Sequence, residues 1–351
     1  MPNRHNARTR RRNILIRVFI AGTLLAGIFS LHAKLGDTLH AIVHANLGFV
    51  VAGLAVRVGS DIITTFKWKR LLKVAGISAP FPVVYRANLI GAFYGLFLPG
   101  AVAGDIARTV VIAPRAGGKA PALASMFMQR NTGMAACLVI ANIGSWINPV
   151  TVSLFSGSFS FMNHLAFWFA LITAAYLVTN FLLLNNAVFH LLWSRSAAAH
   201  HAAPQLHHAN DFRSRVRRFW ESAVRKFARL HDSVLRYRSG ILPAVMLSFV
   251  TQLGDCLVVW CVSRAIDSPL PFLVCCVFVP AVMLMELLPI SIAGVGLRDA
   301  CYVALFASIG RKPESAVAIS FVLLGYYVTI ALVGGLIQWL SPVNVEAAEA
   351  D

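Results

Sequence analysis

Charged residues are scarce in this sequence, and acidic ones are the scarcest. Of the 351 residues, 13% are charged and only 14 are Asp or Glu, whereas 58% are hydrophobic. The mean hydropathy is +0.70. A soluble domain of this length could not bury so much apolar surface, so the composition excludes an ordinary soluble globular protein. The sequence predicts an all-α polytopic membrane protein.

The sequence also lacks the motifs of common enzymes and metal sites. It contains no GxSxG, Walker A or HExxH pattern, and no strand pattern long enough for a sheet domain. The six cysteines fall in apolar segments without CxxC or zinc-ligand spacing, which is typical of small core residues. An alanine-rich stretch without acidic neighbours holds His200, His201, His207 and His208. We therefore expect no catalytic residues, no soluble catalytic domain, no cofactor and no metal site.

Basic residues are the one charged class in excess, and they gather between the apolar segments. The clusters lie at 4–12, at 67–73, at 115 and 119, and at 195–238. This distribution follows the positive-inside rule, so the net charge of +17 indicates topology rather than nucleic-acid binding. We expect a bacterial inner-membrane protein with both termini in the cytoplasm.

Long apolar runs define the predicted membrane domain. A bilayer span needs about 20 mostly apolar residues, and by this measure about six full transmembrane helices are predicted. They lie at about 13–31, 42–66, 120–147, 164–193, 241–262 and 315–340. The first run could also be a cleaved signal peptide, but it is long and further spans follow, so we expect it to be retained. One domain over 1–351 would have halves at about 13–193 and 241–340, joined by a cytoplasmic loop at 194–240.

Two apolar segments remain, at 83–113 and 271–309, and each contains a motif interrupted by Gly and Pro. The motifs are LPGAVAGDIAR at 98–108 and LPISIAGVGLR at 288–298. By charge counting, each segment has both ends on one side of the membrane, and the two segments enter from opposite sides. We therefore predict two re-entrant broken-helix hairpins in an inverted repeat. The expected hinge residues are Pro99, Gly100, Gly104, Pro289, Gly294 and Gly296.

Charged residues inside apolar segments are the candidate binding groups, because each costs roughly 2.5–3.5 kcal/mol to insert. A broken hairpin points a helix N-terminus into the membrane, which favours anions, and guanidinium groups bind phosphate bidentately. Asp105 and Asp299 could be helix caps, arginine partners, or proton or amine sites, while Arg57 and Asp61 could form an ion pair. The predicted lipid-headgroup residues are Arg108, Arg298, Asp105, Asp299, Glu286 and Arg130.

The basic loop has its own pattern. Apolar residues recur every three or four positions over 211–238, opposite a basic face. This pattern predicts an amphipathic helix that lies on an anionic membrane surface. A solvated helix packed against the cytoplasmic helix ends is the alternative.

Together with NLIGAFYGLF at 88–97 and KWKRLLKVAG at 67–76, the two motifs carry a family resemblance. Over about 13–340, the chain resembles the transmembrane region of lysylphosphatidylglycerol synthases and its stand-alone flippase-like relatives. The resemblance places Arg108 and Arg298 at the family's arginines, with Asp299 where glutamate is usual and Ala103 where glycine is common. It implies movement of a modified phospholipid or a polyprenyl-linked lipid across the membrane. The synthases carry an aminoacyl-transferase domain after this region and the sequence shows none, so synthase activity is not expected.

Three functions follow from these observations. The first is a lipid translocator whose two hairpins meet near the membrane midplane. The second is a non-transporting partner that holds a lipid for an envelope lipid or glycan enzyme, with the basic loop helix as its docking surface. The third is an intramembrane transferase that acts on polyprenyl or lipid phosphate. Loss of Arg108 or Arg298 should harm a translocator most, whereas loss of the basic helix should harm a partner most.

Overall fold

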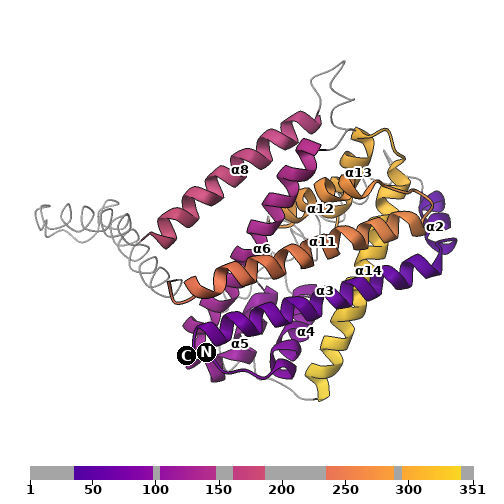
Figure 1. Ribbon diagram of the computed structural model, residues 1–351. Coiled ribbons are helices and arrows are strands. Elements are labelled where there is room, and N and C mark those ends of the chain that lie inside the picture. Colours follow the sequence, from indigo (N-terminus) through magenta and orange to yellow (C-terminus); the bar gives the residue numbers. More distant parts are fainter. Residues whose placement is uncertain (1–34, 98–102, 148–160, 186–234, 288–294, 341–351) are drawn as a thin grey trace, which may run out of the picture.

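The computed structural model describes residues 35–97, 103–147, 161–185, 235–287 and 295–340. Over these residues the fold is a bundle of helices without a strand (Figure 1). This confirms the predicted all-α class. The predicted first span at 13–31, the four loop histidines and 211–234 of the predicted loop helix lie outside the described residues.

Four of the described helices are long and apolar enough to cross a membrane. They are α3 (Leu47–Val74), α8 (Phe161–Leu184), α11 (Ile241–Ala265) and α14 (Pro313–Leu340), and each falls on a predicted span. Large apolar side chains such as Phe167, Leu177 and Trp339 are more than half exposed on them. A surface of this kind is stable only against lipid, so the protein is an integral membrane protein.

The helix α6 (Lys119–Ile147) occupies the remaining predicted span in the described chain. Its 29 residues are long enough to cross a bilayer. It is more polar than the four apolar helices because Gln129, Arg130, Asn131 and Thr132 follow one another near its middle. These polar residues indicate that one face of α6 lies inside the bundle and does not face lipid.

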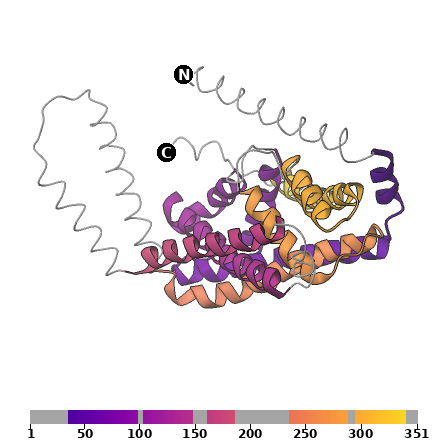
Figure 2. The same cartoon turned by 90° about the horizontal axis from the view of Figure 1, so that it is seen from above.

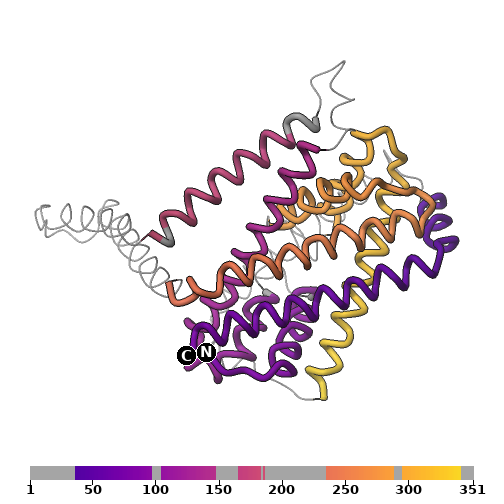
Figure 3. The backbone as a smooth tube through the Cα atoms, viewed as in Figure 1, coloured from indigo at the N-terminus to yellow at the C-terminus, as the bar shows by residue number. Residues whose placement is uncertain are grey.

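The most extensive helix contact among the described residues is made by α3. It runs beside α11 for most of the length of both helices (Figure 3). Close approach is possible because Gly254 of α11 faces Ser60 of α3, where an added Cβ would collide with the serine hydroxyl. The short helix α2 (Leu35–Val43) lies at one edge of the bundle, far from α8 (Figure 2).

Two pairs of short helices stand where the two hairpins were predicted. The first pair is α4 (Phe81–Phe97) and α5 (Ala103–Ala116), and the second is α12 (Phe272–Glu286) and α13 (Leu297–Ser308). These helices have 17, 14, 15 and 12 residues, fewer than the roughly 20 that a full span needs. The helices of each pair pack against one another. The predicted hinges Pro99, Gly100, Pro289 and Gly294 lie outside the described residues.

The cluster of basic residues at the end of α3 differs from its prediction. Lys67 belongs to the basic cluster at 67–73, which the positive-inside rule assigns to the cytoplasmic surface, but it is buried with 4% exposure, as is its neighbour Trp68 with 0%. The ammonium group of Lys67 donates to the Gln129 carbonyl at 3.2 Å and to Ser248 Oγ at 3.0 Å. The reason is that α3 continues to Val74, so this stretch still lies between α6 and α11.

Candidate functional site

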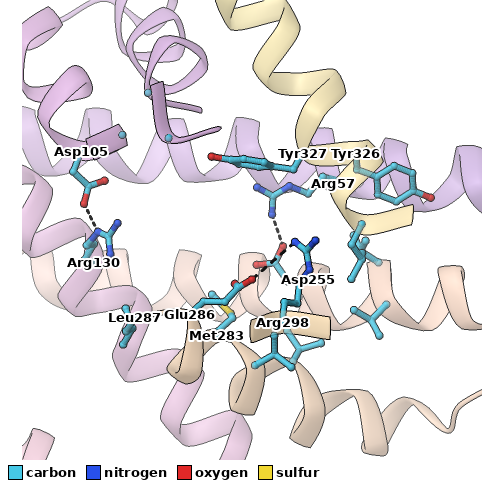
Figure 4. Close-up of a pocket in the computed structure, with 18 of the residues that line it drawn as sticks. Arg57, Asp105, Arg130, Asp255, Met283, Glu286, Leu287, Arg298, Tyr326 and Tyr327 are labelled. Carbon is cyan, nitrogen blue, oxygen red and sulfur yellow. Dashed lines mark hydrogen bonds and ion pairs between the residues drawn. The ribbon is translucent and has the colours of Figure 1, made fainter. Parts of the chain in front are cut away.

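A cavity of about 410 Å³ lies between the two short-helix pairs. The first pair contributes Gly104 and Arg108, and the second contributes Glu286 and Arg298. Long helices from both halves complete the wall, so neither half of the chain forms the cavity alone. Figure 4 shows the labelled side chains facing a common space.

The lining is rich in charge for a site inside a membrane bundle. Among the described residues, four arginines and three carboxylates line it: Arg57, Arg108, Arg130, Arg298, Asp105, Asp255 and Glu286. Every one of these arginines lies within ion-pair distance of a carboxylate. Such pairing is expected, because an unpaired charge in a low-dielectric interior costs several kcal/mol.

The first helix pair presents Asp105 to two arginines. Arg108 Nη1 donates to Asp105 Oδ1 at 3.1 Å, and Arg130 of α6 pairs with the other carboxylate oxygen (Figure 4). Of the three roles that the sequence left open for Asp105, the structure gives it that of arginine partner. The predicted headgroup residues Asp105, Arg108 and Arg130 are therefore neighbours in space.

A glycine on α4 makes room for Arg108. A Cβ built at Gly91 would collide with the aliphatic stem of Arg108 and lie 2.5 Å from its Nε. The Arg108 side chain thus lies directly over the α4 backbone. Its Nε is buried and has no hydrogen-bond partner among the described residues, which leaves one donor for a ligand.

Asp299, the aspartate of the second helix pair, has a different role from Asp105. Asp299 is 2% exposed and does not line the cavity. Its Oδ2 accepts from the backbone N–H of Gly296 at 2.8 Å, so it caps the start of α13. The N-cap Gly296 has a φ of 82° and no side-chain oxygen, so the third helical residue takes the capping role. Of the roles that the sequence left open for Asp299, the structure shows that of helix cap.

Arg298 bridges the break in the second pair. It is 8% exposed, its Nε donates to Ser320 Oγ of α14 at 2.8 Å, and its Nη1 lies 3.9 Å from Glu286 Oε1. Because Glu286 ends α12, the ion pair joins the two helices on either side of the break. Both residues line the cavity.

Arg57 connects α3 to α11. Its Nη2 lies 3.0 Å from Asp61, as the spacing indicated, and its Nη1 lies 2.9 Å from Asp255. Asp255 was not among the residues predicted from the sequence. The sequence signal that could have identified Asp255 is a carboxylate within a predicted span. Its partner Arg57 is 198 residues away in the sequence, so the ion pair could not be predicted from spacing.

Three tyrosines of the cavity wall carried no signal in the sequence. Tyr326 donates to the Val50 carbonyl at 2.6 Å and Tyr327 to the Ala92 carbonyl at 3.2 Å. Tyr302 lines the cavity from α13 and is 2% exposed. Within the part of the chain that the structure describes, no cluster of His, Cys, Asp or Glu could hold a metal ion.

A family model decides the class of this bundle. The model described as the lysylphosphatidylglycerol synthase TM region matches residues 14–335. The chain belongs to this family. The match includes both short-helix pairs and every charged residue of the cavity, and it identifies a membrane protein related to lipid handling. No curated protein and no solved structure matches the chain.

The cavity can therefore be described chemically for a member of this family. Guanidinium groups are the natural ligands of a phosphate, and here each already contacts a carboxylate that a phosphate could replace. The carboxylates also provide acceptors for an amine or hydroxyl group. An arrangement of this kind suits a polar headgroup that carries an anionic group.

Proposed function

We propose that this protein moves a polar lipid between the leaflets of the bacterial cytoplasmic membrane, with the headgroup in the charged cavity. The observation that carries the proposal is the placement of four arginines between the two interrupted helix pairs. Paired interrupted helices near the midplane are where secondary transporters bind their cargo. In this arrangement the two pairs enter the bilayer from opposite sides, and both termini are cytoplasmic.

The size of the cavity fits a headgroup and excludes whole acyl chains. Ligand pockets of roughly 300–1,000 Å³ hold drug-sized molecules, and about 410 Å³ lies at the lower end of this range. The acyl chains would remain in the bilayer, along the exposed apolar faces of the long helices. The cargo class is a modified phospholipid or a polyprenyl-linked lipid, both of which carry phosphate.

The ion pairs of the cavity support a binding cycle. A phosphate that enters can replace Asp105 at Arg108, and the carboxylate can take the arginine back when the phosphate leaves. The empty site thus never holds an unpaired arginine, which would be costly at this depth. The predicted basic loop helix at 211–238 would hold the cytoplasmic face against anionic lipid.

The first experiment is mass spectrometry of the lipids that copurify with the protein. Wild type is compared with the double variant Arg108→Ala/Arg298→Ala and with Arg264→Ala. Arg264 is the matched control, because it stacks on Trp260 with 4.6 Å from its guanidinium carbon to the ring centroid, and it does not line the cavity. We expect one phosphate-bearing lipid to be enriched in wild type and in the control and lost in the double variant.

A transport assay then tests movement itself. The enriched lipid, labelled on its headgroup, is placed in proteoliposomes, and its appearance in the outer leaflet is followed by quenching. We expect wild-type protein to speed this exchange and the double variant to match protein-free vesicles. Tight binding without exchange would contradict the translocator and favour the lipid-holding partner.

A further inference from the structure

A second, smaller chamber adjoins the headgroup cavity. It has a volume of about 50 Å³, its wall comes from α3, α4, α5 and α14, and it shares Arg57, Arg108 and Tyr327 with the larger cavity. One water needs roughly 10–15 Å³ measured in this way, so the chamber has room for a fragment of a few heavy atoms but not for a sugar ring. Two buried polar atoms on its wall indicate what that fragment is.

The first of these atoms is an acceptor on Asn88 of α4. The residue lines the chamber and is 8% exposed, and its Oδ1 is buried without a hydrogen-bond partner among the described residues. The hydroxyl of Thr65 donates to the Asp61 carbonyl at 2.8 Å, so it accepts from Asn88 Nδ2 at 2.7 Å. This fixes the orientation of the amide, and Oδ1 therefore requires a donor from a ligand.

The second atom is the buried Nε of Arg108, a donor without a partner among the described residues. A Cβ built at Gly91 would lie 2.5 Å from this Nε, and Gly91 follows Asn88 by three residues in α4. Side chains three residues apart on a helix share a face, with about 5–6 Å between their Cβ atoms. One small group can therefore reach both the Arg108 donor and the Asn88 acceptor.

A donor and an acceptor side by side select a group that can both donate and accept. A bare anion would accept from Arg108 but leave Asn88 Oδ1 without a donor. A bare cation would leave the Arg108 N–H without an acceptor, and the lining repels it, because two guanidinium groups stand beside one carboxylate that Arg57 already pairs. A hydroxyl group donates and accepts, so it satisfies both atoms. The hydroxyl side chains of Thr64 and Tyr85 in the wall suit a neutral polar group as well.

Arg108 also connects the chamber to the phosphate of the proposed lipid cycle. It lines both spaces, and its Nη1 holds Asp105, the carboxylate that a phosphate would replace. The N–H donors of a guanidinium group are fixed in one plane, so a phosphate at Nη1 leaves Nε for a second acceptor of the same ligand. A headgroup whose hydroxyl lies only a few bonds from its phosphate can occupy both spaces at once.

We propose that the small chamber binds a hydroxyl group of the cargo headgroup, which donates to Asn88 Oδ1 and accepts from Arg108 Nε. This inference rests on the proposed function and narrows its cargo class to a phosphodiester lipid with a polyol headgroup. The phosphate lies in the larger cavity and the hydroxyl in the chamber. Asn88 is then the residue that distinguishes a polyol lipid from a lipid of equal charge without a hydroxyl group.

Competition between two lipids tests the chamber in the wild-type protein. The purified full chain is mixed with equal amounts of dioleoylphosphatidylglycerol and dioleoylphosphatidylpropanol, and the bound lipid is measured by native mass spectrometry. The two lipids have the same acyl chains and the same phosphodiester charge, but only the glycerol headgroup carries hydroxyl groups. We expect the glycerol lipid to bind about tenfold more tightly, because the propyl headgroup cannot pair the buried donor and acceptor. Equal binding would overturn the proposal and show that the chamber holds only water.

The same competition with Asn88→Ala tests the assignment to this residue. Loss of Oδ1 should reduce the preference for the glycerol lipid from about tenfold to about twofold or less. Asn142→Ala is the matched control, because Asn142 Nδ2 also contacts a threonine hydroxyl, Thr173 Oγ1 at 2.8 Å, but the residue lies outside both cavities. The control should keep the full preference. A preference that survives Asn88→Ala would overturn the proposal, and if this variant does not fold, the wild-type competition decides alone.

The two lipids in the proteoliposome assay separate this proposal from the proposed function. A preference for the glycerol lipid in binding, without movement of either lipid, contradicts the translocator and leaves the hydroxyl site standing. Equal binding and equal movement of both lipids contradict the hydroxyl site and leave the translocator standing. Binding of neither lipid above the level of Arg108→Ala/Arg298→Ala overturns both.

Discussion

The two interrupted helix pairs come from similar motifs but are packed in different ways. In the first pair, Gly104 of α5 meets the α4 backbone, where an added Cβ would lie 2.6 Å from the Gly91 carbonyl oxygen. In the second pair, bulky side chains separate the helices, and the rings of Phe278 and Phe306 lie 6.0 Å apart. The first pair therefore tolerates no added atoms at its contact, whereas the second has side chains that can adjust.

The two helix pairs also differ in what their aspartate side chains contact. Asp105 and Asp299 are both the third residue of their helices, α5 and α13. Asp105 contacts two arginines at the cavity, whereas Asp299 caps the start of its own helix. Arg298 is further held by Ser320. We infer that the first pair carries the exchangeable binding contacts and the second provides a fixed frame.

The largest effect is expected from breaking the tight contact of the first pair. Gly104→Val places two methyl groups against the α4 backbone and should cost about 3 kcal/mol or prevent folding. Phe306→Leu, the counterpart in the second pair, should cost about 1 kcal/mol because the core can partly refill the space. Folded yield and unfolding temperature in one detergent give both values.

Gly325→Val is the matched control for Gly104→Val. Gly325 lies within α14 with nothing within 4 Å of an added Cβ, so the substitution should change stability little. Equal losses from Gly104→Val and Gly325→Val would show that the contact with α4 does not limit the first pair.

The second largest effect is expected from replacing Asp105 or Asp299 by asparagine. Asp105→Asn removes the carboxylate that competes with phosphate for Arg108, so a bound phosphate lipid should be held about tenfold more tightly and released more slowly. Asp299→Asn should not tighten lipid binding and should lower stability by about 1 kcal/mol through the lost cap. Lipid titration and thermal unfolding of both variants measure the contrast. Tighter lipid binding in Asp299→Asn would contradict the inference that the first helix pair carries the exchangeable contacts and the second is a fixed frame.

Much of this site was predictable because charge in an apolar segment is a strong signal. Arg108, Arg130, Arg298, Asp105 and Glu286 were chosen on that ground, and all five line the cavity. The sequence left three roles open for each aspartate and could not choose between them. Asp105 lies three positions before its arginine, whereas Asp299 directly follows its arginine, and this spacing alone does not show which carboxylate reaches a free backbone N–H.

Contacts between distant helices were the other limit. The sequence places Arg57 and Asp255 in separate spans, but the register of α3 against α11 depends on small-residue contacts such as that of Gly254 with Ser60. Lys67 was misplaced for a related reason. A basic cluster at the end of an apolar run is typical of the interface, and hydropathy does not show which side chains of the cluster face the bundle.

The smallest expected effect tests whether the frame controls the binding residues. Gly296 and Gly310 flank α13 with φ values of 82° and 67°, so alanine at either position should cost about 1 kcal/mol of strain. Only Gly296 donates to Asp299 and lies two residues before Arg298, so only Gly296→Ala should also weaken lipid binding, by a few-fold. Gly310→Ala should lower the unfolding temperature equally without changing the lipid titration. If both variants leave lipid affinity intact, Arg298 is held by Ser320 and Glu286 alone, and the cap of α13 has no part in the site.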